Sequence, residues 1–466
     1  MSTQLTPARV PFRSRASDRN ALPENRLAFI DQASFLALRA TGQGQLCQCV
    51  WVYERAINFE GLQRFHHSLG HGLLGRRIER SPLPFGRHRW VSWQVSSDID
   101  IAERARARAE LSAWADERAQ LPIDPEWGPV WHLGVVPFTD GSTAISLVAS
   151  HTVVDGLGFC LAIADAAKGD TRDFGYPPPH SRRRLRAALR DARQTAQGVP
   201  EVARTLVTAA KLAPRRRRDI ARPRPSRPVT SLGGGDHGVL VPAIAIHIDL
   251  DDWDACAEAL GGTSNSLLVG FAAKLGERAG RRRAGDGVVT VPFAVSVRTE
   301  GDTRANALSF PTVGVDPARV TTDLRDVRAA LKGALTTLRE VPDERLQLLP
   351  LTPLTPKRAV KRLADVAFSY ADLPVGCSNL GDIDPVVACA DGSDADHAFL
   401  RLVEQQVTRH SLERTRGTLF VASGRIGGKI FITVAGYQLG GDNSKPNLRD
   451  LAAHTLAEFD LTGAID

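Results

Sequence analysis

One histidine of the chain is placed where it could act as a general base. The segment Ser142–Cys160, STAISLVASHTVVDGLGFC, predicts a buried strand that ends at His151 and a helix that opens at Asp155 and Gly156. A histidine at the end of a buried strand is held by backbone on both sides, and its ring can accept a proton near neutral pH. The spacing H-x-x-x-D-G therefore predicts acid–base chemistry at His151, with Asp155 orienting the loop or facing a buried cation.

The same residues also have a purely structural explanation. An aspartate before a helix, as at Asp155, is an ordinary N-cap, and a glycine at the next position needs no special role. His151 could equally be a hydrogen-bonded residue of the core. The pattern is short enough to occur by chance in a chain of 466 residues, so on its own it is a hypothesis about chemistry.

The elements that must position this motif alternate between helix and strand in both halves of the chain. In the first half, hydrophobic spacing predicts helices at 29–38, 59–79, 101–118 and 157–168, and strands at 45–53, 129–138 and 142–150. In the second half it predicts strands at 239–250, 288–297, 417–423 and 429–435, and helices at 251–260, 264–279 and 448–459. This mixture predicts an α/β or mixed α+β fold.

The length of the chain predicts more than one hydrophobic core. We expect a flexible arm at 1–22, an N-terminal subdomain with the motif at 23–175, an Arg- and Pro-rich crossover linker at 176–235, and a C-terminal subdomain at 236–466. The linker has helical spacing at 183–212, which predicts a helix inside it.

Besides the H-x-x-x-D-G motif, five short segments are informative: RLAFIDQASFLAL at 26–38, GPVW at 128–131, GTSNS at 262–266, VPFAVSVR at 291–298 with Asn306 after it, and SNLG at 378–381. Together with the motif, their order resembles the condensation-domain and acyltransferase superfamily, whose signature is H-H-x-x-x-D-G. The resemblance is greatest to its wax ester synthase/diacylglycerol acyltransferase branch. Each segment is a weak signal alone, and their shared order across most of the chain is the strong one.

This resemblance implies two chloramphenicol-acetyltransferase-like subdomains, each a mixed sheet flanked by helices, with an active-site channel between them. His151 would be the general base at mid-channel, and Asp155 would be a structural residue paired with Arg298. The backbone N–H of Gly156, at a helix start, would donate to the developing oxyanion.

The resemblance also implies which residues would surround the substrate. Arg298, Asn306, Asn379 and Ser150 are the candidates, and Asn265 is a weaker one for lining the channel or fixing a turn. Ser150 stands where the family has the first histidine of its pair. The second histidine does the chemistry in that family, so the change leaves activity possible and also keeps open a catalytically silent member.

Charge and composition bound the partners. The net charge is +7, but residues 181–228 hold fourteen Arg and one Lys against three acids, so this segment carries +12 and the rest of the chain −5. Such a segment could meet the phosphates of a thioester donor or make peripheral membrane contact. It contains no aromatic residue on which a base could stack, so no nucleic-acid partner is predicted, although a nucleic-acid or membrane-surface binder stays an alternative class.

The remaining features favour a cytoplasmic enzyme, which could also associate with a membrane. No apolar run has the roughly 20 residues that span a bilayer, and no secretory signal is recognisable. The six scattered cysteines predict reduced core residues and no metal site.

The function expected from these features is O-acyl transfer from a thioester donor to a small-molecule or lipid alcohol. Acyl-CoA or a phosphopantetheine thioester on an acyl carrier protein would be the co-substrate, with no bound cofactor. Two alternatives stay open: a condensation-type enzyme that forms an amide or ester from carrier-bound substrates, and a silent binding module of the same fold.

Overall fold

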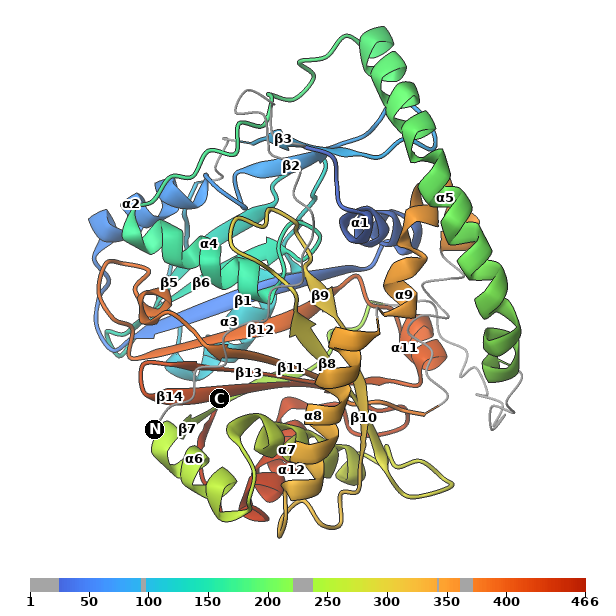
Figure 1. The fold of residues 1–466 in the computed structure, drawn as a ribbon. Coiled ribbons are helices and arrows are strands. Elements are labelled where there is room, and N and C mark those ends of the chain that lie inside the picture. Colours follow the sequence, from blue (N-terminus) through green and yellow to red (C-terminus); the bar gives the residue numbers. More distant parts are fainter. Residues whose placement is uncertain (1–24, 94–97, 221–237, 342, 361–371) are drawn as a thin grey trace.

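The computed structural model describes residues 25–93, 98–220, 238–341, 343–360 and 372–466. The predicted arm at 1–22 and the end of the predicted linker lie outside these residues. Two sheets, with helices around them, form most of the molecule (Figure 1).

The first sheet has the strand order β12-β1-β6-β5-β4, and all its pairs are antiparallel except β4 with β5. Its strands are β1 Gly44–Tyr53, β4 Asp100–Ile101, β5 Trp131–Pro137, β6 Thr143–Ser150 and β12 His397–Gln405. Every residue of β6 is buried, because the sheet is covered on both faces. Helices α2 Phe59–Leu69 and α4 Gly156–Lys168 pack on one face and α3 Leu111–Gln120 on the other.

The second sheet follows the order β10-β8-β11-β13-β14-β7-β15 and mixes parallel and antiparallel pairs. Its strands are β7 Ala243–Asp249, β8 Val289–Ser296, β10 Thr312–Val315, β11 Gly376–Asp382, β13 Thr418–Ile426, β14 Lys429–Tyr437 and β15 Ala464–Ile465, with β9 Leu308–Ser309 beside β8. Around it lie α6 Leu250–Ala259, α7 Ser264–Arg278, α8 Arg325–Glu340 and α12 Lys445–Ala457. A separate hydrophobic core lies under each sheet.

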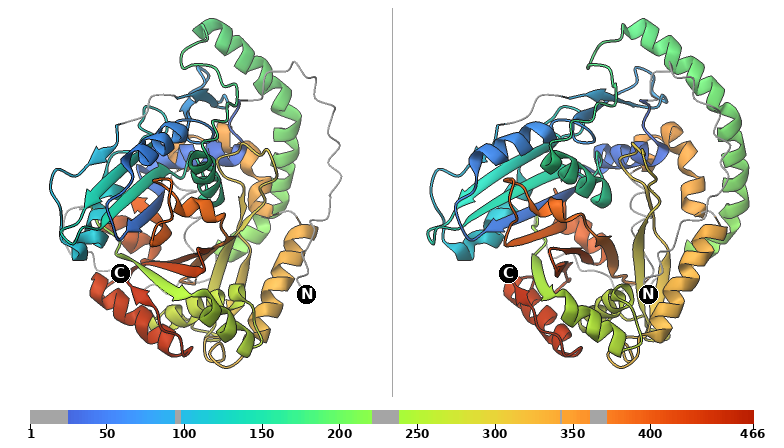
Figure 2. Two further views of the ribbon diagram at one scale, coloured as in Figure 1. Left: turned by 90° about the vertical axis from the view of Figure 1, so that its left-hand side faces the viewer. Right: turned by 60° about the vertical axis from the view of Figure 1, so that its left-hand side comes forward.

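The other elements connect the two sheets or lie outside them. They are α1 Phe29–Thr41, the small sheet of β2 Arg76–Glu79 and β3 Arg89–Ser92, and η1 Arg108–Glu110 in the first half. After these come α5 Arg184–Ile220, α9 Glu344–Gln347, η2 Leu349–Leu354, η3 Pro385–Ala388 and α11 Arg409–Thr415. The helix predicted at 183–212 is thus confirmed and runs to Ile220; it lies on the outside of the molecule in the views of Figures 1 and 2.

Strand β12 links the two halves of the chain. It comes from the segment assigned by sequence to the C-terminal subdomain, yet it pairs with β1 over nine residues, from Gly44 opposite Gln405 to Val52 opposite His397. The predicted limits 23–175 and 236–466 therefore do not divide the strands between the two sheets. Local sequence can predict that a segment is a strand, but its partner depends on contacts far away in the chain.

Two helix predictions in the first half are wrong in extent. The helix expected at 59–79 ends at Leu69, because Gly70 caps it and Gly72 has a φ of 62°, and β2 follows. Leu73 and Leu74 follow this turn, and both are buried in the core, which is why the apolar spacing continues past the end of the helix. The helix expected at 101–118 begins only at Leu111, after β4 and a short 3-10 turn.

Candidate active site

Strand β6 and the turn after it hold His151 in place. The backbone N–H of His151 donates to Gln45 O at 2.8 Å, which continues the β1–β6 pairing by one residue. The chain then turns, because Ser150 O accepts from Val153 N at 2.9 Å and Ser150 Oγ accepts from Thr152 N at 3.3 Å. Ser150 is buried, so it supports the turn beneath His151.

The electrostatic surroundings favour the neutral form of His151. Burial lowers the pKa of the imidazole below its ordinary value, and the nearby charge of Asp155 opposes this shift, as do hydrogen bonds with its own backbone and with Asn306. A neutral imidazole has a free lone pair near neutral pH, which is the form that a general base requires.

Asp155 and Arg298 form a buried ion pair, as the resemblance implied. Arg298 Nη2 lies 2.8 Å from Asp155 Oδ2, and the two side chains are 4% and 0% exposed. Asp155 is also the N-cap of α4: Oδ1 accepts from Gly158 N at 2.7 Å and Oδ2 from Ala307 N at 2.8 Å. Its carboxylate is therefore fully occupied by structural contacts.

Arg298 organises the loop that connects β8 to β9. Its guanidinium donates to three backbone carbonyls of this loop, those of Asp302 and Arg304 at 3.0 Å and of Ala305 at 3.1 Å. The Ala305 carbonyl also accepts from Asp155 N at 2.8 Å. The loop from the second half of the chain is thereby fixed against the motif of the first half.

Asn306 joins this loop directly to His151. Its side-chain amide donates to His151 O at 3.2 Å, and its backbone N donates to Asp31 Oδ1 at 2.8 Å. Asp31, on α1, also accepts from Ala305 N at 3.0 Å and is fully buried. Asp31 was not predicted as a site residue, although it lies within the segment RLAFIDQASFLAL that carried part of the resemblance.

Arg76 is a second anchor that the sequence did not reveal. It is fully buried and donates to Thr303 O at 2.5 Å and Val153 O at 3.1 Å, and it stacks 4.0 Å over the Trp90 ring. Arg76 therefore bridges the loop and the motif turn. It lies in a stretch that the apolar spacing assigned to a helix, and one arginine among the chain's many carries no signal of its own.

Gly156 lies against a residue of the second sheet. A Cβ atom added at Gly156 would stand 2.9 Å from Leu380 Cδ2, so β11 lies directly against the start of α4. Next to Leu380, Asn379 accepts from Gly381 N at 2.9 Å and donates to Asn265 Oδ1 at 3.4 Å. The structure thus brings Asn265, in the first turn of α7, to Asn379, and the side chain of Asn379 fixes the turn at Gly381.

The comparisons with known proteins agree on the fold. No protein-family model and no curated protein sequence matches the chain. Among solved structures, a trichothecene 15-O-acetyltransferase from Fusarium sporotrichioides superposes with a TM-score of 0.56 at 11% identity, over 93% of this chain and 94% of that one. The first condensation domain of the CDA synthetase superposes with a TM-score of 0.54 at 13% identity, over 95% and 99%. The wax ester synthase/diacylglycerol acyltransferase from Marinobacter aquaeolei VT8 gives 0.53 at 14% identity, over 93% and 98%.

The chain has the condensation-domain fold. The predicted fold class, with mixed sheets flanked by helices in two lobes, is confirmed. Identities of 11–14% show the fold alone, so the branch of the superfamily, the reaction and the residue roles remain proposals.

Besides Asp155, a second acid lies in the same row of side chains as His151 on the first sheet. Glu404 of β12 stands opposite Gln45 of β1, and Gln45 O accepts the hydrogen bond from His151 N. Directly opposed residues of antiparallel strands point to the same face, so the three side chains follow one another across the sheet. Burial raises the pKa of Glu404. The sequence analysis missed this residue because it did not predict β12.

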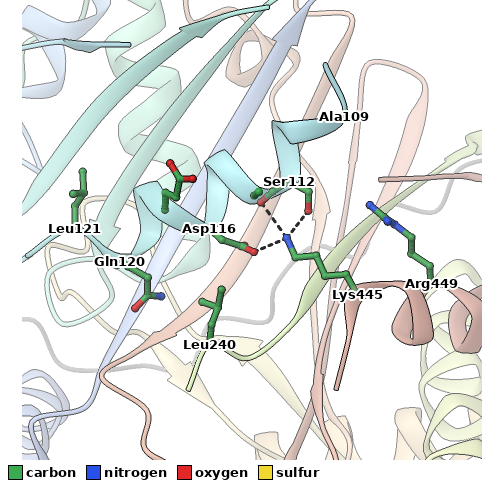
Figure 3. Close-up of a pocket in the computed structure, with 10 residues that line it drawn as sticks. Ala109, Ser112, Asp116, Gln120, Leu121, Leu240, Lys445 and Arg449 are labelled. Atoms are coloured by element: carbon green, nitrogen blue, oxygen red, sulfur yellow. Dashed lines mark hydrogen bonds and ion pairs between the residues drawn. The ribbon is translucent and has the colours of Figure 1, made fainter. Parts of the chain in front are cut away.

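The protein also has a large cavity away from His151. It has a volume of about 680 Å³ and separates α3 from α12 (Figure 3). Lys445 projects across it, donates to Ser112 Oγ at 2.6 Å and Ser112 O at 3.0 Å, and forms an ion pair with Asp116. These contacts connect the two lobes.

This cavity is separated from His151 by the first sheet. Gln48 on β1 donates to Ala115 O of α3 at 2.8 Å, while its neighbour Cys47 points to the other face and lies 3.7 Å from Val154 O in the motif turn. Because adjacent residues of a strand point to opposite faces, α3 and the motif turn lie on opposite sides of the sheet. The cavity is therefore not the predicted channel at His151, and that channel remains a prediction.

Proposed function

We propose that the protein is an acyltransferase that moves an acyl group from a thioester donor to an acceptor hydroxyl, with His151 as general base. The observation that carries the proposal is the arrangement of His151. It lies at the end of β6, where burial lowers the pKa of its imidazole, and the neighbouring carboxylate of Asp155 is held by Arg298 and by backbone donors. The acetyltransferase and the wax ester synthase that share the fold support transfer chemistry at a coarse level.

The proposed reaction needs one proton acceptor and one oxyanion donor. The ring of His151 takes the proton of the acceptor hydroxyl as the oxygen attacks the thioester carbonyl carbon. The negative charge moves to the carbonyl oxygen, where the Gly156 N–H, at the positive end of α4, would stabilise it. The intermediate then expels the thiolate, which receives the proton from His151 and leaves as a free thiol. Ser150, Asn306 and Asn379 are proposed to shape the surroundings of the substrate.

The test is the release of free thiol from acyl-CoAs of short to long chain, each offered with pooled alcohols. Acceptor-dependent release by the native chain that is absent in His151→Ala would support the proposal and give the preferred chain length. If acyl-CoAs give no release, the same assay with acyl groups on a phosphopantetheine carrier protein, and then with amine acceptors, tests the condensation-type alternative. Acyl-chain-dependent thermal stabilisation with no turnover from any donor would contradict the proposal and favour a silent binding module.

The pH dependence of the rate follows from the lowered pKa of His151. The neutral imidazole is the active form, so kcat/KM should fall as the pH drops through the histidine pKa in the free enzyme. Because burial lowers that pKa, the acidic limb should lie below the value of about 6.5 of an unperturbed histidine. Initial rates measured between about pH 5 and 8 would show this. A half-maximal rate at or above the unperturbed value would argue against a buried neutral base.

The close approach of Leu380 to Gly156 predicts a substitution effect at the start of α4. Gly156→Ala should lower kcat/KM by about tenfold to a hundredfold, because the new methyl must displace Leu380 or shift the helix start by a fraction of an ångström. The free energy of unfolding should change by less than about 1 kcal/mol, since alanine is a better helix former than glycine.

The double variant Gly156→Ala/Leu380→Ala separates the causes of this effect. Its kcat/KM should come close to that of Leu380→Ala alone, because the Cδ2 atom of Leu380 that the new methyl would displace is absent. A Gly156→Ala variant that works at the native rate would show that the start of α4 is not beside the reacting atoms.

A further inference from the structure

Helix α5 packs against the protein with the side that is poor in large apolar residues. Ala187, Asp191 and Thr205 are buried, and they recur at helical spacing along one face. Asp191 is held there by Arg89 Nη2 and Ser81 Oγ, each at 2.6 Å. The inner face of the helix is thus small and polar.

The outer face of α5 carries the large apolar side chains. Leu185, Leu189, Val199, Leu206 and Val207 are between 54% and 73% exposed, and exposed alanines lie between them. At 3.6 residues per turn these five fall within a sector of about 100°, along about 33 Å of helix. We call this surface the outer stripe. A helix that only packed on its own protein would show the reverse pattern.

A row of cations borders the outer stripe. Arg186, Arg190, Arg193, Arg204 and Lys211 are exposed and fall within a sector of about 60° next to it. Along the helix between Arg184 and Lys211 the acids are Asp191, which is buried, and Glu201. Leucines and valines beside a row of arginines are the composition of helices that lie in the plane of a membrane interface.

We propose that α5 docks the protein on an anionic lipid surface, with the outer stripe among the acyl chains and the flanking cations at the headgroups. Long arginine and lysine side chains can reach the phosphates while their stems stay on apolar surface. Among the described residues, no helix has the length and apolarity to cross a bilayer. The proposal is independent of the chemistry at His151, and it gives the exposed apolar face an occupant of matching charge.

A second copy of the chain is a poorer occupant of this surface. Two copies of α5 joined antiparallel through their outer stripes would place the row from Arg186 to Lys211 of one copy beside the same row of the other. The two rows of positive charge would repel each other, and the described part of the helix has few acids to neutralise them.

The proposal is tested by sedimentation of the full chain with lipid vesicles. We expect binding to vesicles of phosphatidylcholine with about one third phosphatidylglycerol at low salt, and at least about tenfold weaker binding to phosphatidylcholine alone or at high salt. Leu189→Glu/Leu206→Glu should weaken binding to the anionic vesicles at least about tenfold, because two apolar side chains leave the acyl region.

A matched control separates lipid docking from the added charge. Thr336→Glu/Thr337→Glu adds the same two charges to exposed positions of α8 and should bind within about twofold of the native chain. Thermal unfolding of all three proteins would confirm that they are folded. Equal binding of the stripe variant and the control would overturn the proposal. A native chain that does not bind vesicles would also overturn it. This includes a chain that instead forms a dimer, if Leu189→Glu/Leu206→Glu dissociates that dimer.

Discussion

Replacing His151 with alanine is expected to lower the rate of acyl transfer by about 10²- to 10⁴-fold, the usual contribution of a positioned general base. The fold should survive the change. The structural hydrogen bonds of this residue run through its backbone: His151 N donates to Gln45 O, and His151 O accepts from Asn306 Nδ2. Alanine keeps both of these bonds, so the midpoint of thermal unfolding should move little.

The measurement is kcat/KM for thiol release together with a thermal melt of the same sample. His410→Ala is the matched control, because His410 is exposed on α11 and lies outside the site, and it should transfer at the native rate. A His151→Ala protein that melts normally and keeps its rate within a few-fold would remove His151 from the mechanism. A loss of rate that comes with a large loss of stability would mean that the ring is part of the core.

Much of the local structure around the motif could be predicted from the sequence. The buried strand before His151 and the helix from Gly156 follow from residue types within a dozen positions. The partner of Asp155 is 143 positions away, and its identification as Arg298 depended on a resemblance to a family. Helices and strands can be predicted where apolar residues recur at a regular spacing. A buried contact between distant segments leaves no such signal in the local sequence.

The residues that were missed show this limit clearly. Asp31 and Arg76 are buried charges whose partners are mostly backbone atoms of the loop near Asn306. A backbone carbonyl has no sequence signature, so nothing in the residue types indicates such a contact. Glu404 was missed for a related reason: it enters the row of His151 only because β12 pairs with β1.

Replacing Asp155 with alanine is expected to destabilise the protein by about 3–5 kcal/mol, because it leaves the buried guanidinium of Arg298 without its counter-charge. Loss of the N-cap contact with Gly158 N and of the acceptor for Ala307 N adds to the effect. The contact with Ala307 N and the ion pair with Arg298 hold the loop that carries Asn306 against His151. The rate of transfer should therefore fall as well, at temperatures where the variant is still folded.

Urea unfolding of Asp155→Ala, Arg298→Met and the double variant would measure this coupling. If the two side chains form a buried pair, the double variant should be more stable than the sum of the single losses predicts, by about 1–3 kcal/mol. Asp384→Ala is the control, since Asp384 also caps a helix and pairs with Lys168, but at an exposed site where about 1 kcal/mol or less is expected. Additive losses, or an Asp155→Ala protein with native stability and rate, would show that this pair does not fix the motif loop. Since Asp155 accepts from the first turn of α4 and from the β8–β9 loop at once, a large coupling would mean that the two lobes hold His151 in place together.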